Sequence, residues 1–206
     1  LYIGIRKRTD RKIVYNDLRF PGEKAFSIDD AFAYNKDDDY ANYLNGILKI
    51  MKDEGYSFDS GFEILMFSTI PAGGGVSSSA ALEVGFAYAV SELFGFGIDR
   101  VTIAKMGQQS EHEFMNVKCG IMDQFIVANG QADHALFLDC RDLTTEHVPI
   151  PSDLAIVICD TRHPPALTDG PYNERRASCE EAVEAIAADQ PAVTALRGAG
   201  FVVQAP

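Results

Sequence analysis

Residues 71–82 have the sequence PAGGGVSSSAAL, and this stretch decides how the rest of the chain is interpreted. A strand-like run, residues 62–70, leads into it, and a long apolar segment, residues 80–94, leads out of it. Consecutive glycines let the backbone fold closely around a ligand, and the start of the following helix offers unpaired N–H groups and the positive end of its dipole. This order of features predicts a phosphate cradle.

One alternative explains the same spacing without a ligand. In a tight strand-to-helix connection, Ser77 or Ser78 would only cap the helix. A second alternative, the hydrolase elbow G-x-S-x-G, is excluded because no glycine follows the serines at the required place. The stretch also lacks the Walker and dinucleotide-binding patterns. From spacing alone, the cradle and the capped connection both stay open.

Composition limits the class of protein. The 206 residues are 47% hydrophobic and 23% charged, which is ordinary for a globular protein of one large domain, or one domain plus part of another. The formal net charge of −12 disfavours nucleic acids and anionic membranes as partners. No apolar run reaches membrane-spanning length and no signal peptide is visible, so we expect a cytoplasmic protein.

The four cysteines, Cys119, Cys140, Cys159 and Cys179, are widely separated and include no C-x-x-C pair. This pattern predicts neither a zinc site nor a redox motif. Cys140 and Cys159 stand in apolar, strand-like contexts, where a free cysteine behaves as a small core residue. We therefore expect these two side chains to be buried.

The N-terminal third of the chain predicts two strands and a helix. Residues 1–8 and 13–16 are strand-like and are separated by a short polar turn, which favours a hairpin. Residues 37–54 carry apolar side chains at helical spacing, and Gly55 is a suitable C-cap. The aromatic residues of this helix are expected in the core.

After the glycine stretch, the segment 80–94 is apolar on nearly all sides, which predicts a central, buried helix ended by Gly95. Asp99 caps a second helix that extends to about Phe114. Residues 135–138, 144–148 and 154–159 predict strands. The last of these is continuously apolar and is expected at the centre of a sheet. A final helix extends to about residue 188.

Two carboxylates stand out as candidates for chemistry. Asp123 falls in the first turn of a helix that Gly120 could start, between two apolar pairs. Such an acid is commonly a cap-region carboxylate, but its apolar flanks are unusual for a purely solvated group. Glu111 and Ser79 could together supply the oxygen ligands that Mg²⁺ prefers. Asp123 could then act as base, with His112 and His134 as competitors for that role.

Several separate segments resemble one family, the GHMP small-molecule kinases, and specifically its galactokinase branch. The family's second, ATP-binding motif is similar to PAGGGVSSSAALEV at 71–84. The galactokinase branch is similar in four further segments: YANY at 40–43, CGIMDQF at 119–125, DCR at 139–141 and YNERR at 172–176. The resemblance extends from the first residues to about Ala188.

The resemblance implies transfer of the ATP γ-phosphate to the 1-hydroxyl of α-D-galactose. The residues that would wrap the ATP phosphates are Gly73, Gly74, Gly75, Val76, Ser77, Ser78 and Ser79. Ser79 and Glu111 would hold Mg²⁺, and Asp123 would be the catalytic carboxylate. Gly120, Asp123 and Tyr172 would contact galactose. The implied ligands are ATP, Mg²⁺ and the sugar, with neither nucleic acid nor membrane as a partner.

The implied fold is α+β, the GHMP-kinase N-terminal domain (ribosomal protein S5 domain 2-like), with a mixed sheet and helices packed mainly on one face. Residues 1–188 would form this domain, and residues 189–206 would begin the connection to a missing C-terminal half. The family's first motif, an arginine segment ending in Gly-Glu-His-Thr-Asp-Tyr, and its third, glycine-rich motif are not found in the chain. We therefore expect a domain truncated at its start, with little or no kinase activity when tested alone.

Two rival functions remain open. The first is a kinase of the same superfamily for another sugar, such as N-acetylgalactosamine. The second is a non-catalytic galactose and ATP sensor that regulates transcription through a partner protein. The intact serine run at 77–81 favours an enzyme over a sensor.

Overall fold

The computed structural model describes residues 1–72, 75–159 and 171–199, without the side chains of 171 and 172. The chain divides into two compact units, Leu1–Pro165 and Ala166–Pro206, which are described separately. The second unit contains α5 (Pro171–Ala187) and the short 3₁₀ turn η3 (Leu196–Ala199). Within α5, Arg176 Nε donates to Glu180 Oε1 at 2.6 Å, an i,i+4 pair. The predicted boundary at residue 188 stays a prediction.

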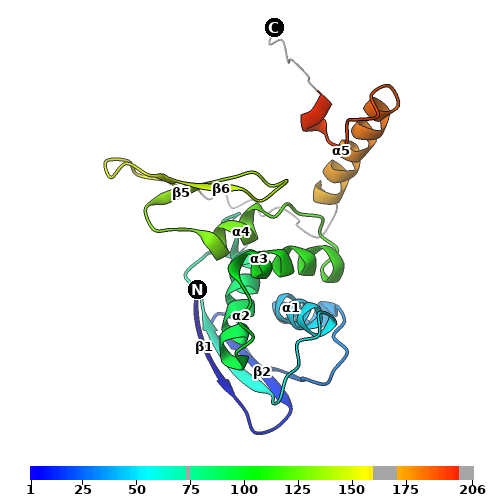
Figure 1. Cartoon of the computed structure of the whole chain (residues 1–206). Helices are drawn as coiled ribbons and strands as arrows, with labels where there is room; N and C mark the ends of the chain where they lie inside the picture. Colours follow the sequence, from blue (N-terminus) through cyan, green and yellow to red (C-terminus); the bar gives the residue numbers. More distant parts are fainter. Residues whose placement is uncertain (73–74, 160–170, 200–206) are drawn as a thin grey trace. The chain divides into compact units, whose positions relative to one another are not determined.

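A mixed four-stranded sheet forms the base of the first unit (Figure 1). Its strands are β1 (Tyr2–Lys7), β2 (Lys12–Asp17), β3 (Lys24–Ser27) and β4 (Phe62–Phe67), in the order β1-β4-β2-β3. Strand β4 is antiparallel to β1 and parallel to β2, and β3 is antiparallel to β2. Both β1 and β2 are therefore present where the sequence predicts them.

The predicted hairpin between β1 and β2 is wrong, because β4 lies between them. Gly61 makes this insertion possible. Its N–H donates to Asp10 O at 2.7 Å and its carbonyl accepts from Arg8 N at 2.9 Å, so the turn after β1 closes around it. A Cβ at position 61 would lie 1.9 Å from Lys12 O. Only a glycine lets the start of β4 come this close.

Helices lie on one face of the sheet, as predicted. Nearest the sheet are α1 (Ala41–Asp53) and α2 (Ser78–Phe94). Helices α3 (Arg100–Gln109) and α4 (Met122–Asn129) pack against α2, and the π-turn η2 (Ser110–Phe114) extends α3. Figure 1 shows α1 and α2 on the same side of β1 and β2. A short 3₁₀ turn, η1 (Lys36–Asp38), precedes α1.

The core lies between the sheet and α1 and α2. Tyr15, Phe62 and Phe86 are all completely buried there, with Tyr15 and Phe86 edge-to-face at 5.9 Å between ring centroids. The Tyr15 hydroxyl donates to Asn45 Oδ1 at 3.2 Å, which satisfies the polar end of a buried ring. The predicted central position of α2 is confirmed: its apolar residues belong to this core on several sides. The N-terminus of α2 is consequently held in place by packing.

Helix ends follow the sequence signals. Gly55 and Gly95 follow α1 and α2 with φ of 89° and 70°, a conformation that glycine adopts without a steric penalty. Asp99 caps α3, accepting from the N–H groups of Val101 and Thr102 at 3.0 Å. No helix in the described part of the chain is long and apolar enough to cross a membrane.

A separate hairpin, β5 (His134–Leu138) and β6 (Thr145–Pro149), follows α4. The strand predicted at 154–159 does not form: these residues pair with no described strand and their side chains are exposed. Ile156 and Val157 are 76% and 80% exposed. The expected burial of Cys140 and Cys159 is also wrong, since both are exposed. Apolar composition alone cannot supply a neighbouring strand, and the described residues offer none here.

Candidate functional site

The start of α2 has the backbone geometry of a ligand cradle. Gly75 and Ser77 have φ of 68° and 58°, and Ser77 occupies the N-cap position without making a side-chain capping bond. Its role as a simple cap, the alternative left open by the sequence, is therefore not realised. A serine in the left-handed region is strained, and such strain gathers at functional sites. Gly73 and Gly74 lie outside the described residues.

The structure brings Ser79, Glu111 and Asp123 together from three elements. Ser79 lies in the first turn of α2, and its hydroxyl approaches the Glu111 carboxylate closely enough to act as a hydrogen-bond donor. Asp123 lies in the first turn of α4, and its negative charge acts on the same carboxylate. Glu111 is only 7% exposed. Burial is the main cause that raises its pKa, Asp123 adds to it, and Ser79 opposes it.

The π-turn η2 sets the position of Glu111. Met115 N donates to Ser110 O at 3.0 Å, an i→i+5 bond that replaces the usual α-helical one. Phe114 is buried in the core at the end of this turn. Glu111 is thus buried next to an anchored aromatic residue, in a helix distortion that is frequent at functional sites.

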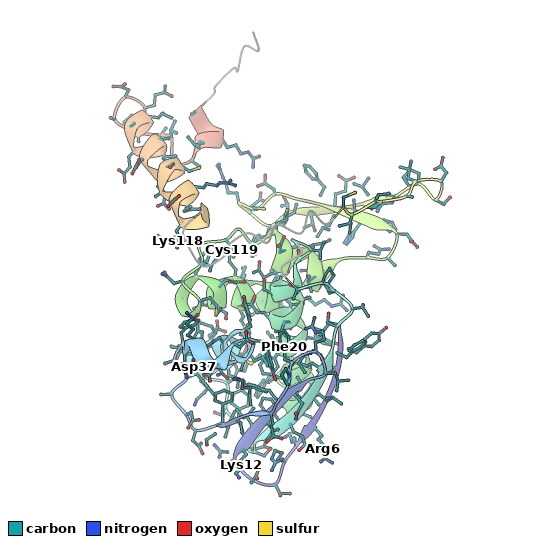
Figure 2. The ribbon with its side chains drawn as sticks, turned by 180° about the vertical axis from the view of Figure 1, so that it is seen from behind. Arg6, Lys12, Phe20, Asp37, Lys118 and Cys119 are labelled. Atoms are coloured by element: carbon teal, nitrogen blue, oxygen red, sulfur yellow. The ribbon has the colours of Figure 1, made fainter. Side chains whose placement is uncertain are left out.

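The two histidines that compete with Asp123 contact backbone carbonyls. Nε2 of His112 lies 2.7 Å from Cys119 O. Cys119 lies in the loop before α4 (Figure 2). Nδ1 of His134 lies 2.8 Å from Ala132 O at the start of β5. One ring nitrogen of each histidine therefore contacts local backbone, and the choice between these residues and Asp123 stays a prediction.

Three buried polar residues behind the site were not singled out by the sequence. Glu83 and Ser110 are completely buried and Gln124 is 2% exposed. Burial, followed by the charge of Glu111, raises the pKa of Glu83 well above its usual value. The available signal was Glu83 itself, the one charged side chain between residues 80 and 91 of an otherwise apolar helix.

The charge of Glu111 also affects the pKa values of Tyr43 and Cys119. Burial is the main cause that raises the pKa of Tyr43 to about 12, and the charge of Glu111 contributes next. The same two causes, in the same order, raise the pKa of Cys119 to about 11. Tyr43, expected as a simple core aromatic, therefore comes from α1 toward the Glu111 carboxylate.

The structure gives less support for the predicted sugar contacts of Gly120 and Tyr172 than for the group of Ser79, Glu111 and Asp123. Gly120 is exposed, and a Cβ built on it would meet no atom within 4 Å, so local packing does not require a glycine there. The side chain of Tyr172 lies outside the described part of the chain. The roles of Gly120 and Tyr172 stay predictions.

No group of three or more His, Cys, Asp or Glu side chains suited to a metal ion exists among the described residues. All four cysteines are free. The expectation that they form neither a zinc site nor a redox motif stays a prediction. The oxygen donors Ser79 and Glu111 are the remaining candidates for a cation, in combination with a ligand that brings its own oxygens.

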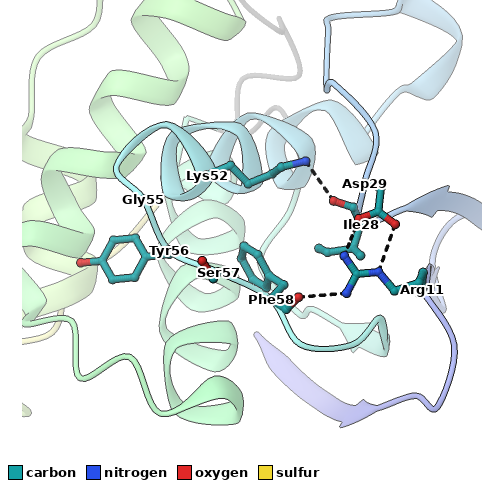
Figure 3. A pocket seen from close by; sticks show the side chains of 8 residues that line it. All are labelled: Arg11, Ile28, Asp29, Lys52, Gly55, Tyr56, Ser57 and Phe58. Carbon is teal, nitrogen blue, oxygen red and sulfur yellow. Dashed lines mark hydrogen bonds and ion pairs between the residues drawn. The ribbon is translucent and has the colours of Figure 1, made fainter.

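A cavity of about 360 Å³ lies away from these residues, between the β2–β3 region and the end of α1 (Figure 3). Its two cations already have partners. Arg11 bonds to Asp29 and to Phe58 O, and Lys52 Nζ donates to Ile28 O at 2.9 Å. This cavity is a crevice stabilised by internal bonds, and none of the predicted site residues lines it.

Comparison with known proteins supports one family. Residues 42–131 match the GHMP kinases N terminal domain. The chain is 42% identical over 188 residues to a galactokinase from Fusobacterium nucleatum, covering 90% of this chain and 48% of that protein. It is 40% identical over 195 residues to a galactokinase from a Roseiflexus species, covering 95% and 49%. The chain thus spans about half the length of the curated relatives it matches.

Solved structures agree with this assignment. A Lactococcus lactis galactokinase complexed with galactose superimposes with a TM-score of 0.80 and 32% identity, over 90% of this chain and 48% of that one. A Methanococcus jannaschii mevalonate kinase shares the fold, with a TM-score of 0.56 and 23% identity. The chain therefore has the fold of the GHMP-kinase N-terminal domain and is similar to the galactokinases over about half of their length.

Proposed function

We propose that the chain supplies the phosphate-binding, metal-binding and catalytic carboxylate residues of a kinase for the 1-hydroxyl of α-D-galactose. The observation that carries the proposal is the meeting of Ser79, Glu111 and Asp123 at the starts of two helices and a π-turn. The galactokinase relatives, matched over about 90% of this chain, favour galactose and ATP as the substrates.

The start of α2 would bind the nucleotide phosphates. The first N–H groups of a helix have no partner within it, and its dipole favours negative charge. Gly75 and Ser77 turn the backbone toward this end with left-handed φ values. In our proposal residues 73–79 wrap the phosphates, and the buried packing of α2 holds this end ready before the nucleotide arrives.

Ser79 and Glu111 fit Mg²⁺ by their chemistry. A hydroxyl and a carboxylate are hard oxygen donors, and two protein ligands leave positions for phosphate oxygens and waters. Bound there, Mg²⁺ would neutralise charge on the phosphates. Within the protein, the task of Ser79 and Glu111 is to fix these oxygens at the start of α2.

Asp123 would act on the sugar. Its carboxylate accepts a hydrogen bond from the galactose 1-hydroxyl and takes that proton as the hydroxyl oxygen bonds to the γ-phosphorus, while the bond to the ADP oxygen breaks. The half-buried position of Asp123 in the first turn of α4 keeps the carboxylate oriented. Gly120 and Tyr172 complete the proposed sugar contacts.

A chimera tests this function. The matching region of the Fusobacterium nucleatum galactokinase is replaced by this chain, and ADP release is followed with galactose, N-acetylgalactosamine or no sugar. We expect galactose-dependent turnover. Asp123→Asn should lower kcat by about 10²- to 10⁴-fold, the contribution typical of a general base, with unchanged binding of a non-hydrolysable ATP analogue.

Other outcomes decide between the rivals. Turnover that prefers N-acetylgalactosamine would assign the other sugar kinase. Binding of galactose and ATP without turnover, in a folded chimera, would assign the sensor. Unchanged kcat in Asp123→Asn would remove the proposed base.

A further inference from the structure

Each of the three proposed site residues has a buried polar residue beside it in the sequence. Glu83 follows Ser79 by four residues on α2, which places both on one face of the helix. Ser110 directly precedes Glu111 in the π-turn, and Gln124 directly follows Asp123 in α4. We call Glu83, Ser110 and Gln124 the buried polar layer.

The members of this layer meet one another. The side chains of Ser110 and Gln124 both approach the Glu83 carboxyl, and Glu83 and Glu111 interact through their charges. Yet both carboxyl oxygens of Glu83, the Ser110 hydroxyl and the Gln124 amide oxygen have no hydrogen-bond partner of normal geometry within the described residues. Gln124 Nε2 instead donates a weak bond to Cys119 Sγ at 3.8 Å.

Glycines in the surrounding helices make room for the layer. A Cβ at Gly46 of α1 would lie 2.2 Å from Ser110 Oγ. A Cβ at Gly107 of α3 would lie 3.0 Å from Gln124 Cγ. Helices α1 and α3 are therefore both shaped to admit side chains of the layer at close range.

Such a cluster is costly for folding alone. Buried polar atoms without full hydrogen bonding lower stability, and apolar side chains of similar size would fill the same space more favourably. Natural proteins break the rules of good packing mainly at functional positions, while the structure around these positions obeys them. The residues of the layer belong to the same three elements that carry Ser79, Glu111 and Asp123.

Resting on the proposed function, we infer that the buried polar layer positions the metal-binding pair Ser79 and Glu111, with Glu83 at its centre. The three residues act through the first-turn backbone of α2, the π-turn and α4, and do not touch the ligand. They are positioning residues. Their loss should weaken metal-dependent nucleotide binding without unfolding the protein.

The test uses the galactokinase chimera described above, which also carries the part of the relative that this chain does not match, and a non-hydrolysable ATP analogue. Its affinity is measured by calorimetry in Mg²⁺ and again in EDTA, together with the thermal midpoint. We expect Glu83→Leu and Ser110→Ala to weaken Mg²⁺-dependent binding by about fivefold or more, as is typical of residues supporting metal ligands, with the EDTA affinity unchanged. Glu83→Gln, which keeps a polar group of the same shape, should restore most of the difference.

Ser91→Ala is the matched control. Ser91 is also a buried helical serine, 1% exposed, but its hydroxyl accepts from Ile98 N at 3.1 Å, far along α2 from the layer. It should alter the thermal midpoint only. If the layer had a purely structural role, its variants would lose nucleotide binding only in proportion to the fraction of protein that is unfolded. That loss would then be the same in Mg²⁺ and in EDTA.

The outcomes separate the two proposals. If the unmodified chimera binds the analogue in Mg²⁺ and the folded layer variants bind it equally well, the positioning role is overturned and the proposed function stands. If the folded, unmodified chimera does not bind the analogue at all, the proposed function fails, and the positioning role fails with it.

Discussion

Glu111 is the residue on which the candidate site converges. It approaches the Ser79 hydroxyl and interacts with the charge of Asp123. After burial, which is the main cause, its charge is the next cause that raises the pKa of both Tyr43 and Cys119. Its own carboxylate is removed from water without a cation beside it among the described contacts. Such a residue opposes folding in the metal-free state and favours whatever brings a cation.

Glu111→Gln should therefore stabilise the metal-free chain, increasingly so at higher pH. The pKa of Glu111 is raised in the folded state. Between its unfolded and folded pKa values, the folded chain holds a proton that the unfolded chain has released, so stability falls as pH rises through this window. Glutamine has no proton to release. The measurement is the thermal midpoint of both proteins in EDTA, from pH 4.5 upward. The midpoint of the variant should rise above that of the unmodified chain as pH increases through the window between the two pKa values. Above this window the difference between the two midpoints should stay constant.

A midpoint difference that stays the same across this pH range would contradict the expected pKa shift of Glu111.

The same Glu111→Gln variant should lose Mg²⁺-dependent nucleotide binding by about tenfold or more, because a neutral amide is a poorer Mg²⁺ ligand than a carboxylate. The two readouts move in opposite directions, which separates a ligand from a merely structural acid.

Ser79, Glu111 and Asp123 could be singled out from the sequence because residue type and spacing indicate their chemistry, and their roles stay predictions. The sequence could not predict that Glu83, Ser110 and Gln124 meet, since their contact depends on how three helices pack. The left-handed backbone conformation of Ser77 could not be predicted either, because the surrounding structure imposes it.

At the scale of elements, the close approach of Gly61 to Lys12 determines the strand order. Gly61→Ala should lower the free energy of unfolding by about 3 kcal/mol or more, since a Cβ 1.9 Å from a backbone oxygen forces the strands apart. Gly4→Ala in β1 is the matched control, as its Cβ would lie 4.0 Å from Leu65 O, in ordinary contact. Urea unfolding at pH 7 compares them. Equal stability of the two variants would contradict this explanation of the strand order.

Arg19 connects the end of β2 to the segment leading into the glycine stretch. It forms a two-pronged ion pair with the buried Asp17, with Nη2 2.9 Å from Oδ2, and its Nη1 donates to Ile70 O at 3.2 Å. Although burial opposes it, hydrogen bonding to Arg19 lowers the pKa of Asp17. The pair therefore helps to hold the approach to the candidate site.

Arg19→Gln should destabilise the chain by roughly 1–3 kcal/mol at pH 7, because Asp17 is left buried without its cation. The pKa of Asp17 is lowered in the folded state, so the stability it contributes is present above its unfolded pKa and is lost as pH falls through the folded value. The difference between the two proteins in urea should narrow below about pH 4. A penalty that persists unchanged in acid would show that packing, and not charge, sets it.

Helices were easier to predict than strand pairing. Helical periodicity and caps are local, so α1, α2 and α3 appear within a few residues of their predicted bounds. Pairing joins distant segments, and nothing in the sequence near β1 and β2 indicates that β4 separates them. The run 154–159 failed as a strand for the same reason, because its apolar side chains specify burial but no partner.

For the whole molecule, that exposed run should govern solubility. Leu154, Ile156, Val157 and Ile158 are 63–80% exposed, and unpaired apolar segments favour association between chains. The net charge of −12 opposes this by repulsion, and salt screens it. We expect association that rises with protein and salt concentration.

Ile156→Lys combined with Ile158→Lys should reduce this association. The free energy of unfolding should change by less than about 0.5 kcal/mol, as for most surface substitutions. Sedimentation at low and high salt is the measurement. Thr145→Lys with Glu146→Gln, on the exposed strand β6, makes the same change of two charges and controls for it. Association that persists in the isoleucine double variant would place the contact elsewhere.

The π-turn at Ser110–Phe114 makes chain length itself a determinant of the site. An i→i+5 turn accommodates one residue more than an α-helix does over the same rise. Deleting a single exposed residue there, His112, would let an ordinary α-helix cover the same rise, so Phe114 could keep its place in the core. Glu111 would then be one residue closer to Phe114 along the chain, and its side chain would change direction relative to the core and leave the site. Relatives that lack the extra residue would have to supply the carboxylate from another position, so insertions and deletions should be far rarer here than substitutions.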